Sequence, residues 1–291
     1  MKNSTQIFRM LPLLLILLSF GIAAGCEGVS ELRVVKSTEI QQARALAEGF
    51  VGITVAPDTG ERFLLHEKAG IYRLSETGEL SLLVSNAELR NSADFAPTTD
   101  FTDIAALGNE RFGLIAANDG FLYDHRFGQL SLHFCYEPGF VEPEPGEPSP
   151  VEPGPDPVPT EPNHRQISLS LSYDPVQRQL IAQPRTFDEE SGELLAAHIA
   201  TFAVDSGVEQ GWYSLPDSHT LAGGIALENT NRVLLGEGHE LHRFQVDARE
   251  AKRVADLSSW VDEITGLARG MDGRVLVLDG VRGRILELDL P

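Results

Sequence analysis

A repeat of short, alternating apolar runs limits the folds open to this chain. From residue 51 to residue 290 the runs come in groups of four, and Gly, Asp or Asn turns separate them. Alternation of this kind predicts β-strands that are buried on one face. The repeated units are residues 51–84, 102–134, 167–213, 224–255 and 264–290, and the last unit has only three runs.

Units of roughly 40 to 50 residues with four strands each predict an all-β fold, the β-propeller. A twisted four-stranded sheet can bury its faces only against the next copy, so the copies form a ring. We expect five blades, or six if the irregular third unit hides another. A β-sandwich and an open array of sheets are the alternatives, and the even strand spacing favours the propeller.

The incomplete last unit predicts how the ring closes. It ends at Pro291 without a fourth strand, while the segment 31–36 near the N-terminus resembles the fourth strand of the preceding unit, residues 251–255. We therefore expect the N-terminal strand to complete the last blade. This pairing would bring both chain ends into one sheet and remove an exposed edge.

The first residues have the layout of a secretory signal peptide. Lys2 and Arg9 precede an apolar run over residues 11–20, which is too short to suit a transmembrane helix. Ala23-Ala24-Gly25-Cys26 follows and resembles a bacterial lipobox, which implies a signal peptide over residues 1–25 and a lipidated Cys26. By the same resemblance, Glu27 implies sorting to the outer membrane, facing the periplasm or the cell surface. An ordinary signal peptide with an incidental cysteine is the alternative.

The domain organisation follows from these segments. Residues 26–49 would hold the lipidated N-terminus, the closing strand and a short helix, for which Thr38 with Gln41 has capping-box spacing and Gly49 is a stop. Residues 50–291 would form the propeller. Residues 137–162 interrupt it with ten prolines, seven acids and no Lys or Arg, so we expect a disordered, solvated insertion there. It would be a partner-binding arm or a tolerated surface loop.

Charge and cysteine content exclude several classes of function. The chain has 43 acidic and 23 basic residues, a net charge of −20, which argues against binding nucleic acid or an anionic membrane by charge. Two cysteines exclude a disulfide-stapled scaffold and a thiolate metal cluster. After processing, Cys135 would be alone, and we expect it to be a small buried residue of a strand.

The last unit, from Ile264 to Asp289, resembles the blades of NHL, gluconolactonase-like and phytase-like esterase propellers. It shares with them a small-residue inner strand, an Asp-Gly turn, and second and third strands that end in Asp. The resemblance extends as a repeat pattern over residues 50–290. It implies the fold and leaves the activity open, because propellers carry many unrelated functions.

The common catalytic motifs are absent from the sequence. It contains no G-x-S-x-G, Walker loop, H-E-x-x-H or C-x-x-C. His66-Glu67 lacks a second histidine four residues on. His239 and His242 are three residues apart, which on a strand places them on opposite faces, and we expect both at the surface.

Oxygen ligands nevertheless recur in loops that would open on one face of the ring. These loops carry Glu48, Glu67, Asp103, Asn118, Asp119, Glu237, His239, Glu263 and Asp279. A converging set would suit a divalent cation such as Ca²⁺, and the candidate ligands are Glu48, Asp103, Asn118, Asp119, Glu263 and Asp279. Glu48-Gly49 resembles the Glu-Gly that begins the first blade of gluconolactonase-like enzymes, which hold a divalent ion. Turn formation is the alternative role of these residues.

The sequence therefore predicts an envelope lipoprotein, anchored in a membrane by its lipid, whose propeller is a binding or assembly module. Its partner would be another envelope protein or a small ligand at the mouth of the ring, and not nucleic acid. The alternative is a divalent-metal hydrolase, lactonase- or phosphoesterase-like, with its site at that mouth.

Overall fold

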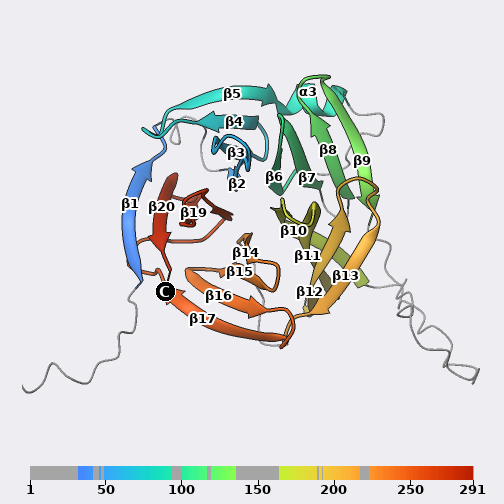
Figure 1. The fold of residues 1–291 in the computed structure, drawn as a ribbon, viewed down its shortest axis with the longest axis vertical. Coiled ribbons are helices and arrows are strands. Elements are labelled where there is room, and N and C mark those ends of the chain that lie inside the picture. The colour runs from blue at the N-terminus through green and yellow to red at the C-terminus, as the bar shows by residue number, and fades with distance from the viewer. Residues whose placement is uncertain are drawn as a thin grey trace, which may run out of the picture.

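The computed structural model describes residues 32–41, 46, 49–92, 100–116, 119–135, 164–188, 190–191, 193–216 and 223–290. They form five four-stranded antiparallel sheets arranged as blades around a central axis (Figure 1). The predicted all-β propeller is thus confirmed with five blades, and the third unit is one blade of longer strands. Cys26, the lipobox and the insertion at 137–162 lie outside the described residues.

The strands of the blades match the predicted runs closely. Blade 1 comprises β2 (Phe50–Val55), β3 (Arg62–His66), β4 (Gly70–Leu74) and β5 (Leu80–Ser85). Blade 2 comprises β6 (Asp103–Gly108), β7 (Arg111–Ala116), β8 (Asp119–Asp124) and β9 (Gln129–Cys135). Blade 3 comprises β10 (His164–Asp174), β11 (Gln179–Asp188), β12 (Leu194–Ala203) and β13 (Glu209–Ser214). Blade 4 comprises β14 (Ile225–Asn229), β15 (Arg232–Glu237), β16 (Glu240–Gln245) and β17 (Glu250–Asp256).

The N-terminal strand closes the ring, as predicted. Blade 5 comprises β18 (Gly266–Arg269), β19 (Val275–Asp279), β20 (Arg284–Asp289) and β1 (Arg33–Glu39). β1 pairs antiparallel with β20 from Arg33 opposite Asp289 to Glu39 opposite Arg284 (Figure 1). Thr38 lies in this strand, so its predicted role as a helix cap is wrong; the long-range pairing outweighs the local signal. Of residues 42–48 the structure describes only Leu46.

Apolar side chains hold the blades together through five clusters, one between each pair of neighbouring blades. Phe63 of β3 stacks edge-on against Phe112 of β7 in one of them, with ring centroids 5.0 Å apart. The short helix α3 (Asn86–Asn91) adds the buried Leu89 to the same cluster, and Ser85 and Glu88 form its capping box. Within the described part of the chain, no helix is long and apolar enough to span a membrane.

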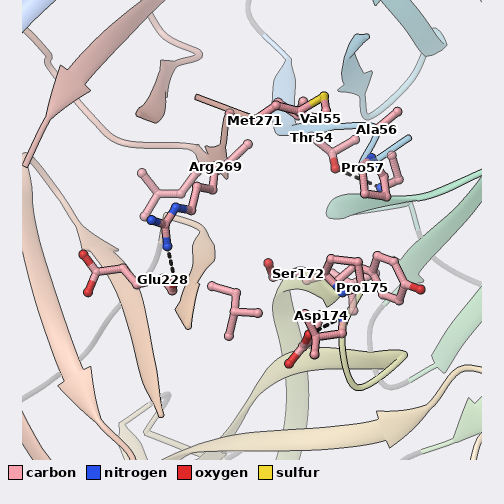
Figure 2. A pocket seen from close by; sticks show the side chains of 18 of the residues that line it. Thr54, Val55, Ala56, Pro57, Ser172, Asp174, Pro175, Glu228, Arg269 and Met271 are labelled. Atoms are coloured by element: carbon pink, nitrogen blue, oxygen red, sulfur yellow. Dashed lines mark hydrogen bonds between the residues drawn. The ribbon is translucent and has the colours of Figure 1, made fainter. Parts of the chain in front are cut away.

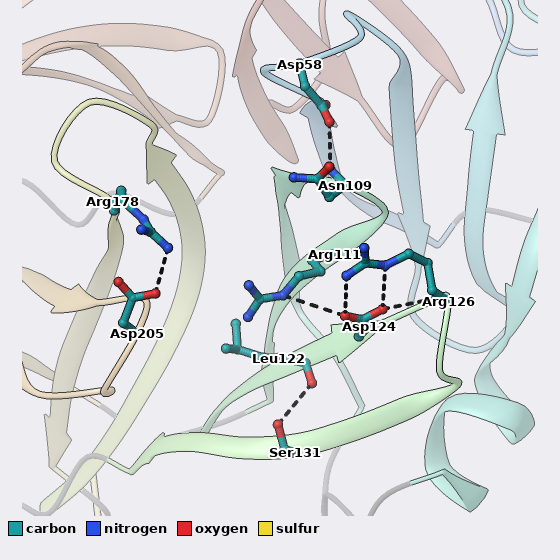
Figure 3. Close-up of polar contacts among 9 residues, drawn as sticks. All are labelled: Asp58, Asn109, Arg111, Leu122, Asp124, Arg126, Ser131, Arg178 and Asp205. Carbon is teal, nitrogen blue, oxygen red and sulfur yellow. Dashed lines mark hydrogen bonds and ion pairs between the residues drawn. The ribbon is translucent and has the colours of Figure 1, made fainter.

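The two ends of the ring differ in their connections. At the hairpin face, the first strand of each blade turns back into its second strand. At the crossover face, the chain passes from the outer strand of one blade to the inner strand of the next. Polar contacts join neighbouring hairpins at the hairpin face: the backbone N–H of Asn109 donates to Asp58 Oδ2 at 2.7 Å (Figure 3).

Candidate ligand-binding site

A cavity of about 530 Å³ occupies the centre of the ring at the hairpin face (Figure 2). The inner strand of every blade contributes to its wall, together with the turn that follows in four of them. The lining residues are 53–57, 106, 171–176, 227–230 and 267–271. Because each blade interface is packed with apolar side chains, the ring holds this wall in place without a ligand.

The wall of the central cavity is mainly apolar. Its backbone segments carry Ile, Val, Leu, Ala, Pro and Met side chains, and Met271 lies exposed at the rim. An apolar, preformed hollow with a few polar groups is the usual form of a small-molecule site.

Two of the polar groups in the wall are already used in structural hydrogen bonds. Thr54 Oγ1 accepts a bond of 2.8 Å from the N–H of Ala106, which joins blades 1 and 2. Asp174 Oδ1 accepts bonds from the N–H groups of Val176 and Gln177, at 2.8 and 3.1 Å, and so shapes the turn of blade 3 (Figure 2). Neither group has to be paired by a ligand.

Besides Asp174, the wall holds two charged residues, Glu228 and Arg269. Arg243 donates from Nε and Nη2 to the two carboxylate oxygens of Glu228, at 2.6 and 2.7 Å. Arg269 donates from Nη1 to the backbone carbonyl of Glu228 (Figure 2). The carboxylate of Glu228 is thus neutralised by Arg243, and Arg269 keeps its own charge.

The cavity holds several groups suited to binding. Its described lining offers the hydroxyls of Thr54, Ser172, Tyr173 and Thr230. Its two carboxylates, Asp174 and Glu228, accept bonds from backbone N–H groups and from Arg243. Shape, apolar contact, hydroxyls and one guanidinium are what this site can offer a ligand.

The metal ligands predicted from the sequence lie at the opposite end of the ring. Asp103 begins β6, Asp119 begins β8, Asp279 ends β19, and Glu263 precedes β18, so all four belong to the crossover face. Glu48 and Asn118 lie outside the described residues. The central cavity opens at the hairpin face instead, and its mostly apolar lining carries no motif that the sequence could reveal.

Two of the candidate metal ligands act as buried structural carboxylates. Asp103 Oδ1 and Oδ2 accept bonds from the N–H groups of Ile104 and Leu171, at 2.8 and 2.7 Å. Burial raises the pKa of Asp103 well above its usual value, and these two bonds oppose the rise. Asp279 accepts from the N–H groups of Asp262 and Arg282, each at 3.0 Å. The calcium site and the hydrolase that depends on it stay predictions.

The histidine pair of blade 4 is arranged differently from the expectation. His239 is exposed, but His242 is buried, with Nε2 at 3.3 Å from Glu240 and 3.6 Å from Glu237. The prediction that both lie at the surface is wrong for His242, because β16 turns it toward blade 3. In the described chain, the one group of metal-type ligand atoms lying within 4.8 Å of each other is that of His239, Glu240 and Asp256. Arg253 already binds Glu240 there, at 2.5 Å.

The comparisons with known proteins assign the chain to no family. No protein-family model matches it, and no curated protein does. Solved structures do match, among them one described as the crystal structure of RRP9 WD40 repeats. The match has 10% sequence identity and a TM-score of 0.44, and it covers 91% of this chain and 98% of that one.

Proposed function

We propose that this protein is a binding module of the cell envelope that takes a small, largely apolar ligand into the central cavity. The observation that carries the proposal is the cavity itself: about 530 Å³, walled by the inner strands of all five blades. Its volume falls within the range of roughly 300 to 1,000 Å³ typical of small-molecule sites. A protein partner that covers the hairpin face without entering the cavity is the competing outcome.

The proposed location follows from the N-terminus of the chain. A lipidated Cys26 would hold the propeller at a membrane, because acyl chains contribute about 0.8 kcal/mol for each buried methylene. The acidic protein would then need no basic surface to stay there. Expression of the full chain and of C26A in a Gram-negative host tests this. We expect the full chain in the membrane fraction and C26A in the soluble fraction; equal membrane recovery would contradict the anchor.

A neutral fluorescent probe tests the cavity. N-Phenyl-1-naphthylamine fluoresces more strongly in apolar surroundings, and we expect it to bind with a Kd on the order of 10 µM. Ser172 lines the cavity (Figure 2), so Ser172→Phe should fill it and weaken the probe at least tenfold. Ser81→Phe places the same ring on the exposed outer strand β5 and serves as the control. Equal binding by both variants and the wild type would place the probe outside the cavity.

A further inference from the structure

The central cavity adjoins a second, smaller one with a different lining. This side cavity measures about 240 Å³ and lies between blades 4 and 5. Glu228, Asn229 and Arg269 belong to the walls of both cavities, so the two are neighbours along one side of the ring. Arg232 and Arg243 line the side cavity but not the central one. A ligand in the central cavity can therefore extend toward a group of arginines.

The side cavity concentrates positive charge in an acidic protein. Three arginines line it against one carboxylate, that of Glu228, which gives a formal charge of +2. The whole chain carries −20. Charge of the opposite sign to the rest of the molecule, gathered in a hollow, attracts an anion.

The hydrogen bonds within the cavity leave this charge in excess. Arg243 uses its Nε and Nη2 on Glu228, so that pair is neutral. Arg232 donates from Nε to the amide oxygen of Gln245 at 3.0 Å, and Arg269 donates to a backbone carbonyl. Both acceptors are uncharged, so neither bond neutralises its guanidinium.

Three arginines elsewhere at the hairpin face are paired with acids. Arg126 binds Asp124 at 3.0 Å, Arg111 lies 4.0 Å from the same carboxylate, and Arg178 binds Asp205 at 2.7 Å (Figure 3). Among the described ion pairs, none involves Arg232 or Arg269. The chain is rich enough in acids to pair them, and the uncompensated charge sits where two cavities meet.

We infer that the ligand is an amphipathic anion, with its apolar body in the central cavity and its oxyanion on Arg269 and Arg232. A carboxylate, sulfonate or phosphate group suits the guanidinium fork, since each offers two oxygens to parallel N–H donors. This inference rests on the proposed function and adds the chemical class of the ligand. Arg243 would keep the carboxylate of Glu228 neutralised, so that it does not repel the bound anion.

Two matched probes separate the inference from the proposed function. 8-Anilino-1-naphthalenesulfonate has the anilinonaphthalene body of the neutral probe and adds a sulfonate. Because a hydrogen bond between charged groups is stronger than a neutral one, the wild type should bind the sulfonate probe at least roughly ten times more tightly. This preference should shrink as salt rises from 50 to 500 mM, because exposed charges are screened.

Single variants then assign the preference to the side cavity. Arg269→Gln should reduce the preference for the sulfonate probe over the neutral probe about tenfold, whatever small change in neutral-probe affinity follows from its place in the cavity wall. Arg232→Gln, at a second exposed position, should also weaken the sulfonate probe. Agreement between the two variants would exclude a local folding defect in the first one as the cause. Arg126→Gln removes the same charge from blade 2 and should change neither affinity.

The outcomes are distinct. Failure of the neutral probe to bind the wild type would overturn the proposed function. Binding of the neutral probe without a wild-type preference for the sulfonate, or with a preference that both Arg269→Gln and Arg232→Gln retain, would overturn the anion inference alone.

Discussion

The carboxylate of Asp103 in β6 accepts a hydrogen bond of 2.7 Å from the backbone N–H of Leu171 in β10. One buried side chain thus joins the inner strands of blades 2 and 3, and Leu171 itself lines the central cavity. Thr54 makes the equivalent connection between blades 1 and 2 through the N–H of Ala106. The position of the cavity wall depends on these clamps between inner strands.

We predict that Asp103→Asn lowers the free energy of unfolding by about 1 to 3 kcal/mol. An amide presents its NH₂ group to one of two backbone donors, Ile104 or Leu171, and leaves that donor unpaired. Because burial raises the pKa of Asp103, the folded state binds its proton more tightly than the unfolded state does. The contribution of Asp103 to the free energy of unfolding of the wild type therefore falls as pH rises from about 4 toward the raised pKa.

Urea unfolding of the wild type and Asp103→Asn between pH 3 and 8 checks both parts. The deficit of the variant, meaning its free energy of unfolding relative to the wild type, should be largest near pH 4. It should narrow as pH rises. Asp124 is the matched control, because Arg126 lowers its pKa. The deficit of Asp124→Asn should instead widen as pH rises through the ordinary Asp range. A deficit of Asp103→Asn that also widens would contradict the account of this clamp.

Arg185 predicts a substitution that stabilises the protein. It is buried in β11, its Nε and Nη2 have no hydrogen-bond partner, and burial lowers its pKa to about 10 although Glu237 opposes the shift. Arg185→Met removes a buried charge and keeps an unbranched apolar stem. We expect a gain of about 1 to 3 kcal/mol in urea unfolding at pH 7.

The gain in the free energy of unfolding of Arg185→Met should be constant below pH 10, where the wild-type arginine is charged in both the folded and the unfolded state. It should shrink at higher pH, because the folded wild type then releases the proton of Arg185. Arg178→Met, on an exposed residue, should shift stability by less than about 0.5 kcal/mol. A loss of stability in Arg185→Met would mean that the guanidinium is better compensated than its contacts indicate.

Strand periodicity and turn residues predicted the ring because they report local properties that the fold uses directly. The runs at 62–66 and 70–74 coincide with β3 and β4, and the turn at 67–69 separates the two strands. The closing strand followed from counting: three runs in the last unit required a fourth from elsewhere. Thr38 shows the limit of this reasoning, because its pairing with Ile285 joins positions 247 residues apart and no local pattern records it.

The cavity could not be predicted in the same way. Ile53, Val55 and Leu267 look like any other strand residues, and only the curvature of the ring decides that part of their surface faces a hollow. The acidic turn residues instead favoured a predicted metal site at the crossover face. One usable signal was present: Arg232, Arg243 and Arg269 stand near strand ends in two successive repeats of an acidic chain.

The closing strand should be essential for a cooperative fold. A chain that begins at residue 41 lacks β1 and exposes the edge of β20, whereas one that begins at residue 32 keeps the pairing. We expect the shorter chain to melt about 10 °C lower or more, or to aggregate, and the longer chain to match the mature protein. Calorimetry on both checks this. Equal melting temperatures would contradict closure through β1.

The proline-rich insertion should be dispensable for folding. The nine residues 257–265 connect β17 to β18 across the same face. Replacing residues 140–160 by Gly-Ser leaves nine residues between β9 and β10, so the ring should still form and bind the neutral probe with unchanged affinity. Far-UV circular dichroism, the melting temperature and a probe titration check the replacement. A large fall in melting temperature would assign the insertion a structural role.

Photoaffinity labelling tests the central cavity most directly. A decanoate that carries a diazirine in its chain is irradiated with the mature protein, and the modified peptides are mapped by mass spectrometry. We predict labels within residues 53–57, 171–176, 227–230 and 267–271, and their loss in Ser172→Phe. Labels confined to the crossover-face loops or the outer strands, and unchanged in that variant, would contradict the account.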